Sequence, residues 1–575
     1  MPQSSRARRA PSARRLAVLA GVLWLAATWP LGAASRAPVR ADHGMVGSTE
    51  AHATRVGVDV LKKGGNAVDA AVAVGFALAV THPSAGNIGG GGFMVIRLPD
   101  GRATTIDYRE RAPARASRDM YLDAQGTVVP ERSLVGPLAA GVPGSVAGLA
   151  YAHAKFGKLP WRDLVQPAVE LAGQGFVVSD ALARSLEASR TLLERFPESK
   201  RIFLNGGALW KPGDRLVQAD LAKTLARIAR DGAAGFYSGE TAGLLLAEMQ
   251  RTNGLIEAGD LSSYAPVERP PVAGTYRGFD LVSMAPVSSG GIAVIQALNI
   301  LEAWPLRQFG HNSSKTIHLV AEAMRRVYAD RSEWLGDPEF FRVPVAGLVS
   351  KRYATALRAS IREDRATPSS EVGPGQPSAY ESDQTTHYSV VDAEGMAVAT
   401  TTTINGGYGN GQVVPGAGFL LNNEMDDFSA KPGVPNMFGV TGGKANEIAP
   451  RKRMLSSMTP TIVSRDGKLL LVVGSPGGSR IITTVLQVIM NVLDHGMDVQ
   501  ESVDAPRFHH QWLPDEIRVE RLGFPADVVK NLEALGHKVS TQADMGDVHA
   551  IYVDPRTGTR YGASDPRMDG RTEGH

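Results

Sequence analysis

The sequence predicts a large α+β protein built from layers of helices and sheets, and three observations support this. The chain has 575 residues, more than one hydrophobic core usually serves, so we expect one large layered domain or two closely associated ones. Apolar residues make up 43% and charged residues 21% of it, which is a globular composition. Helical patterns dominate residues 145–365, whereas strand patterns dominate the chain after residue 383.

The N-terminal segment, residues 1–34, has the three-part pattern of a secretory signal. Five arginines and no acidic residue precede an apolar run over residues 16–27, and small residues at 32–34 suit a cleavage site. A membrane anchor would need about 20 apolar residues, and Pro30 comes too early for that. We expect export by the general secretory route, rather than by the twin-arginine route that one arginine pair loosely resembles. The product would be periplasmic or secreted, with no stable membrane span.

Charge and residue usage exclude several functions. Removal of the signal would change the formal net charge from +3 to −2, because five arginines leave with it, so we expect no nucleic-acid partner. The chain has no cysteine, which excludes disulfides, thiol catalysis and thiolate metal sites. It also lacks an HExxH motif, a Walker motif and a dinucleotide fingerprint, and the side chains of adjacent His509 and His510 should diverge. We therefore expect no metal and no cofactor.

The first structural elements after the signal are two predicted helices, at residues 48–63 and 66–80. Gly64 and Gly65 between them suit a C-terminal cap, and Asn66 suits an N-cap with Asp69 in the first turn that follows. The second helix is apolar on nearly every face, which predicts a buried core helix.

A glycine run at residues 89–92 leads into a predicted hairpin. Residues 93–96 and 104–108 have strand patterns on either side of an Asp-Gly turn. The glycines could suggest a phosphate-binding loop, but no Lys-Ser or Lys-Thr follows them and the next element is a strand. Close packing of the backbone is the favoured interpretation.

The remaining elements follow from local patterns. Residues 367–383 are rich in Pro, Gly and Ser, so we expect this segment to be exposed and mobile, and suited to cleavage. Apolar spacing predicts helices at 317–335 and 481–493, a short strand starting at 276–279, strands at 387–391 and 396–404, and a hairpin from 462–463 and 469–473.

Gln384-Thr385-Thr386 contains the candidate nucleophile, since no Gly-x-Ser-x-Gly elbow occurs. A threonine hydroxyl needs a base, and the α-amine of Thr385 would serve if the chain were cut before it. That amine has a pKa of about 8, so a useful fraction is neutral at physiological pH. Taken alone, two threonines at the start of a strand are ordinary, so the assignment depends on the rest of the sequence.

Five segments stand out in this order: Asp107-Tyr108-Arg109-Glu110, QTTHYS at 384–389, NNEMDDF at 422–428, LSSM at 455–458 and GSPGGSR at 474–480. Together they resemble the γ-glutamyltranspeptidase family of N-terminal nucleophile hydrolases. The resemblance extends from about residue 44 to residue 566. It implies an α+β fold, a four-layer αββα sandwich, formed by a precursor that cuts itself between Gln384 and Thr385. A large subunit (35–384) and a small subunit (385–575) would then form one catalytic domain as a heterodimer.

The resemblance also implies a catalytic mechanism. Thr385 would attack the γ-carbonyl of a γ-glutamyl compound such as glutathione, and the resulting acyl group would pass to water or to an amino-acid or peptide acceptor. Thr403 would hydrogen-bond the nucleophile. Backbone N–H groups of Gly477 and Gly478 would stabilise the oxyanion.

The resemblance further assigns the substrate-binding residues. A γ-glutamyl group carries an α-carboxylate and an α-ammonium, and both need partners when buried. Arg109 would bind the carboxylate with help from the Ser456 and Ser457 hydroxyls. The ammonium would be received by Asp427, Glu424 and Asn405. Singly, each motif also fits a surface ion pair, a loop or a solvated turn, but jointly they match this substrate.

Residues 431–439 resemble the lid over the pocket in bacterial members of the family. Some members have Tyr where this chain has Phe438, so a hydroxyl contact to the Asn405 region would be missing, which leaves open the balance between transfer and hydrolysis.

Two alternatives remain within the same fold: a glutaryl-type β-lactam acylase and a poly-γ-glutamate processing enzyme. Arg109 with Asp427 favours a substrate that carries both α-charges, which a glutaryl group lacks. A non-catalytic binding protein would stay as one intact chain, and the presence of Thr385, Thr403, Gly477 and Gly478 argues against it.

Overall fold

Two antiparallel β-sheets lie at the centre of the computed structural model, which describes residues 35–380 and 391–575. One sheet has the strand order β1-β17-β16-β12-β11-β9-β8 and the other β10-β3-β4-β7. Strand β10 packs against β12, so the two sheets face each other. Both sheets combine strands from before residue 381 with strands from after residue 390. The strands are β1 (Val39–Ala41), β3 (Gly91–Arg97), β4 (Ala103–Asp107), β7 (Val267–Arg269), β8 (Val272–Tyr276), β9 (Phe279–Ser283), β10 (Ala397–Thr403), β11 (Thr461–Arg465), β12 (Lys468–Gly474), β16 (His549–Val553) and β17 (Arg560–Ser564).

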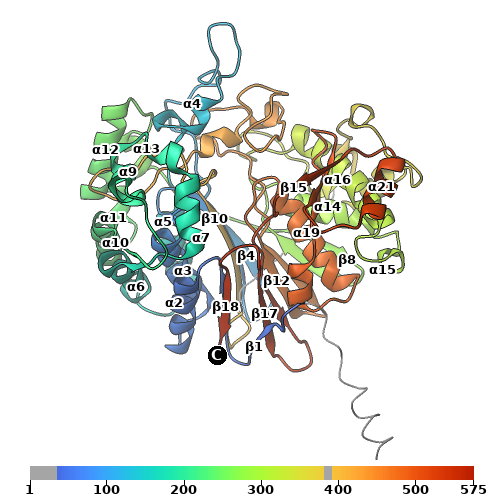
Figure 1. Ribbon diagram of the computed structural model, residues 1–575, viewed down its shortest axis with the longest axis horizontal. Coiled ribbons are helices and arrows are strands. Elements are labelled where there is room, and N and C mark those ends of the chain that lie inside the picture. The colour runs from blue at the N-terminus through green and yellow to red at the C-terminus, as the bar shows by residue number, and fades with distance from the viewer. Residues whose placement is uncertain (1–34, 381–390) are drawn as a thin grey trace, which may run out of the picture. The chain divides into compact units, whose positions relative to one another are not determined.

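Helices cover the outer face of each sheet (Figure 1). On one side α3 packs against β10, and α5 packs against β3 and β4; on the other, α14 packs against β8 and β9, α19 against β12, and α20 against β16 and β17. This helix–sheet–sheet–helix order confirms the predicted αββα sandwich. The main helices are α2 (Ala51–Lys62), α3 (Ala67–Thr81), α5 (Ser145–Phe156), α6 (Trp161–Gln174), α10 (Ala219–Asp231), α12 (Gly239–Thr252), α14 (Gly290–Leu301), α16 (Ser314–Trp334), α18 (Lys351–Arg358), α19 (Arg480–Leu493), α20 (Val499–Asp504) and α21 (Ala526–Ala534).

The first two helices form largely as the sequence predicts. Asn66 caps α3 in a capping box with Asp69, and Gly64 has φ +88°, the left-handed conformation of a helix C-terminal cap. The predicted start at Ser48 is wrong, because α2 begins at Ala51 with Glu50 as its cap. Ser48 instead ends strand β2 (Met45–Ser48), which pairs with β18 (Arg571–Gly574) near the end of the chain.

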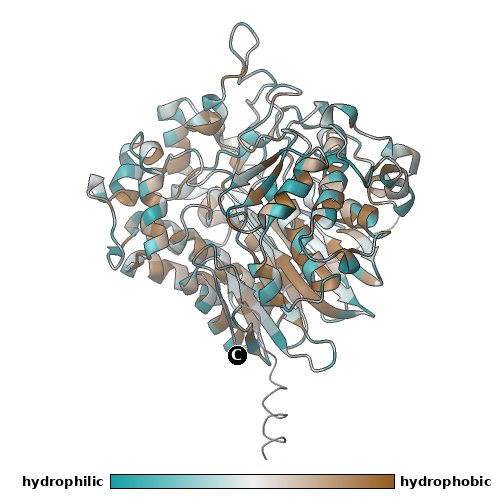
Figure 2. Ribbon diagram, turned by 45° about the vertical axis from the view of Figure 1, so that its right-hand side comes forward, coloured by the Kyte–Doolittle hydropathy of each residue, from teal (hydrophilic) through white to brown (hydrophobic). Residues whose placement is uncertain are grey.

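Strands β3 and β4 form the predicted hairpin, and β11 and β12 form the second one. The close packing that the glycine run predicts is observed at Gly90, since a Cβ on this residue would lie 2.1 Å from the Thr403 carbonyl oxygen. Apolar residues concentrate on the central strands and on the helix faces that cover them (Figure 2). The glycine run is therefore a packing feature of the sheet.

Two local predictions need correction. Residues 277 and 278 are not the start of a strand but the turn between β8 and β9, with φ +48° at Arg277 and +81° at Gly278. Ser369, in the segment expected to be exposed, is buried, and its hydroxyl donates to the Trp512 carbonyl (2.6 Å).

Some predictions fall outside the described residues. These are the secretory signal at 1–34, the nucleophile segment Gln384-Thr385-Thr386 and all but the last residue of the strand at 387–391. Across residues 35–380 and 391–575, none of the helices combines the length and apolar character needed to cross a bilayer.

Candidate active site

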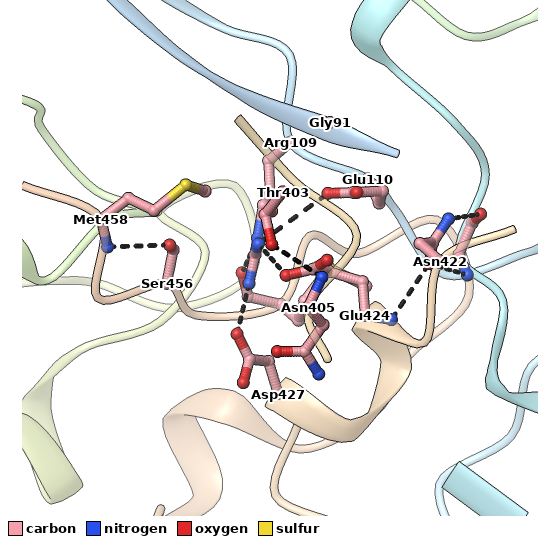
Figure 3. Close-up of polar contacts among 12 residues, drawn as sticks. Gly91, Arg109, Glu110, Thr403, Asn405, Asn422, Glu424, Asp427, Ser456 and Met458 are labelled. Atoms are coloured by element: carbon pink, nitrogen blue, oxygen red, sulfur yellow. Dashed lines mark hydrogen bonds and ion pairs between the residues drawn. The ribbon is translucent and has the colours of Figure 1, made fainter. Parts of the chain in front are cut away.

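The predicted site residues converge because several strands end at the same edge of the sandwich. Sheet register places Thr403, the last residue of β10, opposite Gly91 at the start of β3, and Asp107, the last residue of β4, opposite Phe93. The loop after Asp107 carries Arg109, so this arginine and Thr403 are brought to one edge (Figure 3). Segments that are hundreds of residues apart in the sequence thereby lie together in one site.

Arg109 is the centre of a buried cluster of charges. Its side chain is 1% exposed; Nη1 donates to Glu424 Oε1, and Nη2 donates to Asp427 Oδ2 at 2.6 Å. Glu110 lies 3.8 Å from Nη1. Nε donates to the Met454 carbonyl at 3.2 Å, which ties the arginine to the loop before β11. Arg109 therefore joins the motifs at 107–110 and 422–428, as Figure 3 shows. A longer contact from Nη2 to the Leu455 carbonyl reaches the motif at 455–458.

This cluster contains three carboxyl groups and one guanidinium. Burial raises the pKa of Glu110 to about 7, and it also raises the pKa of Asp427 and, well above its usual range, that of Glu424. Arg109 opposes these shifts but does not cancel them. Although burial disfavours its charged form, the three carboxyl groups hold the pKa of Arg109 above its ordinary value. The cluster has an excess of acidic groups, which a further cation would reduce.

Two asparagines shape the backbone around this cluster. The Asn422 side chain accepts from the N–H groups of Gly141 (2.8 Å) and Glu424 (3.0 Å) and donates to the Gly89 and Gly141 carbonyls. Asn405 has φ +70°, its N–H donates to Thr403 Oγ1 (2.7 Å), and its side-chain amide donates to the Asn423 carbonyl (3.0 Å). Sequence reasoning missed the role of Asn422, which positions Glu424.

Ser456 and Ser457 form a turn beside the Arg109 cluster. Ser456 Oγ accepts from the Met458 N–H at 3.1 Å, and Ser457 Oγ accepts from Arg331 Nη2 at 3.0 Å. The Arg109 side chain reaches the same turn through its long contact to the Leu455 carbonyl (3.4 Å). The predicted proximity of the two serines to Arg109 is therefore observed, whereas the contact with Arg331 was not predicted.

Gly477 and Gly478 follow β12 at the same edge of the sandwich. Their φ angles are +136° and +59°, and within the described part of the chain neither N–H group has an acceptor. A Cβ on Gly478 would lie 2.4 Å from the ring of Phe438. Gly478 therefore has no room for a side chain, whereas Gly477 has space for one but a backbone conformation that favours glycine. Two N–H groups without an acceptor among the described residues suit the predicted oxyanion role.

The predicted lid is attached to the charged cluster by one hydrogen bond and to the adjacent Asp426 by another. Asn436 Nδ2 donates to Asp427 Oδ1 (3.1 Å), and the Met437 N–H donates to Asp426 Oδ2 (3.0 Å). Met437 Sδ, rather than a hydroxyl of residue 438, lies beside Asn405 Nδ2, at 3.7 Å. The Phe438 ring instead packs against Gly478, so the lid reaches the predicted oxyanion turn.

The structure thus brings together the predicted substrate-binding residues, and it places Thr403, Gly477 and Gly478 at the same edge. The partners of Thr385 are not described. Residues that sequence reasoning missed are Glu110 as a buried member of the cluster, together with Ser289, Arg331, Asn422 and Asn436. Glu110 and Asn422 lie within the matching motifs and Asn436 lies within the predicted lid, which were usable signals, whereas Ser289 and Arg331 have no local sequence signal.

The chain is similar to several known proteins. The family model described as gamma-glutamyltranspeptidase matches residues 53–575. A glutathione hydrolase proenzyme of Escherichia coli strain K12 is 55% identical over 540 residues, which cover 94% of this chain and 93% of the relative.

Two solved structures are also similar. A cephalosporin acylase from Bacillus halodurans superposes with a TM-score of 0.84 at 28% identity, covering 95% of this chain and 99% of the other. A gamma-glutamyltranspeptidase from Helicobacter pylori superposes with a TM-score of 0.56 at 48% identity, covering 57% of this chain and 94% of the other.

Proposed function

The chain belongs to the γ-glutamyltranspeptidase family, and we propose that it is a self-processing enzyme that transfers γ-glutamyl groups. Its donors are glutathione and related γ-glutamyl compounds, and its acceptors are water, amino acids or peptides. The name of the E. coli relative, a glutathione hydrolase proenzyme, supports both the substrate and the processing.

The observation that carries the proposal is the charge pattern of the pocket. Three buried carboxyl groups surround one guanidinium at Arg109, so the cluster has an acidic excess that one more cation would reduce. Two serine hydroxyls that accept hydrogen bonds from protein donors lie next to this cluster. A γ-glutamyl group presents an ammonium and a carboxylate on one carbon, so it matches an acidic subsite beside a subsite of hydrogen-bond donors.

The proposed reaction has two stages. In processing, water adds to the carbonyl of Gln384 and the Gln384–Thr385 C–N bond breaks, which leaves a carboxyl group on Gln384 and a free amine on Thr385. That amine then takes the proton of the Thr385 hydroxyl as the hydroxyl oxygen bonds to the γ-carbonyl carbon. The C–N bond then breaks, and the leaving amine receives that proton. Gly477 and Gly478 N–H groups stabilise the oxyanion, and Thr403 holds the nucleophile. Water or an acceptor amine next attacks the ester and releases Thr385.

A second candidate function is acylase activity on glutaryl-type substrates, because the B. halodurans cephalosporin acylase has a similar structure. A glutaryl group has a carboxylate but no ammonium, so it would leave the acidic excess around Arg109 unbalanced. Initial rates on a γ-glutamyl anilide and on a glutaryl anilide separate the two functions. We expect the γ-glutamyl substrate to be faster by at least about 100-fold, which corresponds to one charge-assisted contact. Equal or reversed rates would refute the transferase assignment.

Processing is tested on a denaturing gel of the purified protein. We expect two bands, with N-terminal sequencing placing Thr385 first in the smaller fragment. The Thr385→Ala variant should remain a single chain with no measurable turnover of the γ-glutamyl anilide, because both the nucleophile and its cleavage are lost. Retained turnover in that variant would place the nucleophile elsewhere.

We also propose that the chain is exported and that its signal, residues 1–34, is removed. Both fragments would then remain together as a heterodimer in the periplasm or outside the cell. The large fragment should begin at Ser35 when the protein is expressed with its own N-terminus. A large fragment that begins at residue 1 would contradict signal cleavage.

A further inference from the structure

A second buried guanidinium, Arg331, lies beside the Ser456–Ser457 turn. It belongs to helix α16 and is 7% exposed. Nε donates to Ser289 Oγ at 2.9 Å, and Nη2 donates to Ser457 Oγ at 3.0 Å. Among the described residues, no carboxylate lies within ion-pair distance of Arg331, whereas buried arginines normally have one. This part of the pocket therefore has a positive charge that only neutral groups contact.

Arg331 belongs to the same electrostatic site as the Arg109 cluster. Burial lowers the pKa of Arg331, Asp427 opposes that shift, and Arg109 adds to it. The guanidinium nevertheless stays protonated, since arginine ionises only at very high pH. An anion that entered the pocket would thus meet a charge that no described carboxylate compensates at close range.

The contact with Arg331 also determines how the Ser457 hydroxyl can act. A hydroxyl has one proton to donate, and its oxygen accepts from other donors. Because Ser457 Oγ accepts from Arg331, its own O–H is free to point at a different acceptor. Ser456 Oγ accepts from the Met458 N–H (3.1 Å) in the same way. Both serines are arranged as donors toward an anion.

Arg331 holds the backbone of this turn as well. Its Nε bonds Ser289 Oγ, and both the hydroxyl (2.6 Å) and the N–H (2.8 Å) of Ser289 donate to the Ser456 carbonyl. One turn earlier on α16, the Tyr328 hydroxyl donates to the Ser479 carbonyl, next to Gly478. One buried helix therefore fixes both the serine turn and the segment that follows the predicted oxyanion glycines.

We propose that Arg331 is a positioning residue that makes the pocket select the α-carboxylate of the γ-glutamyl group. It aims the Ser457 O–H at that carboxylate and supplies the positive charge behind it. The terminal nitrogens of Arg109 already contact Glu424 and Asp427. Protein carboxylates therefore largely neutralise the charge of Arg109, whereas the charge of Arg331 is available to the substrate. This inference rests on the proposed function, because it assumes a γ-glutamyl substrate.

The test compares a γ-glutamyl anilide with its α-carboxamide analogue, which has the same shape without the negative charge. In Arg331→Met, we expect kcat/KM for the carboxylate substrate to fall roughly 10- to 100-fold, mainly through KM. The value for the carboxamide should change less than about threefold. Arg331→Lys keeps the charge and should recover part of the loss. If an analogue reacts too slowly, its Ki as a competitive inhibitor of the γ-glutamyl anilide gives the same comparison.

Arg326 provides a matched control on the same helix. It is also buried, but it bonds Glu322 and Ser360 and has no contact with the serine turn. Arg326→Met should lower the Tm without changing the preference for carboxylate over carboxamide. Equal losses on both substrates in Arg331→Met would show a merely structural role and overturn the proposal.

Ser457→Ala keeps the test decisive if Arg331→Met does not fold. This variant removes only the hydroxyl that Arg331 orients, and we expect the preference for the carboxylate substrate to fall about 3- to 10-fold. An unchanged preference would overturn the proposal. Wild-type protein that is inactive on both anilides would instead refute the proposed function itself.

Discussion

Two neighbouring regions of the candidate site compensate their buried charges in opposite ways. The acidic region consists of Arg109 with three carboxyl groups, whereas the hydroxyl region consists of Arg331 with three serines. Three carboxyl groups compete for one guanidinium in the first region, and no described carboxylate pairs with the guanidinium in the second. The members of the acidic region are Arg109, Glu110, Glu424 and Asp427, and those of the hydroxyl region are Arg331, Ser289, Ser456 and Ser457.

This difference shows how one pocket can bind both charges of an α-amino acid group. A substrate ammonium reduces the acidic excess of the acidic region. A substrate carboxylate accepts hydrogen bonds from the free O–H groups of the hydroxyl region. Each region is costly to bury alone, because burial raises carboxyl pKa values on one side and leaves a cation without an ion pair on the other. Binding a group with both charges relieves both costs at once.

The largest expected effect comes from removing the guanidinium of the acidic region. Arg109→Met leaves Glu424 and Asp427 buried without their partner, so we expect a loss of about 3 to 5 kcal/mol of folding free energy. Arg331→Met should cost less, because it leaves only serine hydroxyls behind. Thermal unfolding of the two variants, measured side by side at pH 7.5, checks this order.

Arg109→Lys is the control for charge. It keeps a cation beside the carboxyl groups, but a single ammonium cannot bind Glu424 and Asp427 at the same time as the planar guanidinium does. Its Tm should lie between those of wild type and Arg109→Met. Equal Tm losses in Arg109→Met and Arg331→Met would remove the contrast between the two regions.

A smaller effect is expected from Asp427→Asn, which removes one negative charge from the acidic region. The substrate ammonium would lose a charge-assisted contact, so kcat/KM for the γ-glutamyl anilide should fall roughly 10- to 100-fold. A glutaryl anilide has no ammonium and should be affected far less. The ratio of the two rates, measured for wild type and variant, isolates the ammonium contact.

Asp426→Asn is the matched control for that experiment. Asp426 bonds Ser133 (2.6 Å) and the Met437 N–H rather than Arg109, so its loss should alter the lid contact and leave the substrate ratio near the wild-type value. A similar drop of the ratio in both variants would mean that the lid, not the ammonium contact, sets the preference.

The sequence predicts the local parts of this arrangement well. The cap at Asn66, the hairpin between β3 and β4 and the close packing at Gly90 each depend on residues near one another in the chain, so local patterns suffice. The motifs around Arg109 and Asp427 were assigned to one pocket through the family resemblance, and the structure places them in direct contact.

The parts that could not be predicted depend on contacts between distant segments. Helix α16 is buried along most of its length, including Arg325, Arg326 and Arg331, so a pattern of apolar spacing cannot tell which arginine faces the pocket. The local pattern predicts a helix start at Ser48, yet this residue lies in strand β2, opposite Arg571 of β18 near the other end of the chain. The motif match also predicted that Arg109 binds the substrate, but it did not predict the ion pairs of Arg109 with Glu424 and Asp427.

The smallest expected effect concerns the ionisation of Glu110, whose pKa burial raises from 4.5 to about 7 while Arg109 opposes the shift. Because the folded-state pKa lies above the unfolded value, Glu110 contributes stability that is fully present below pH 4.5 and is lost as the pH rises through about 7. Glu110→Gln cannot ionise, so the Tm of wild type should fall more than that of the variant between pH 5 and pH 8, by on the order of a few degrees.

Arg109, Glu424 and Asp427 also face this group, so the same pH scan on Asp427→Asn shows how far the acidic region titrates as a unit. Parallel Tm profiles for wild type and Glu110→Gln would mean that Glu110 is already ionised at pH 5 and that the acidic excess is larger than its pKa indicates.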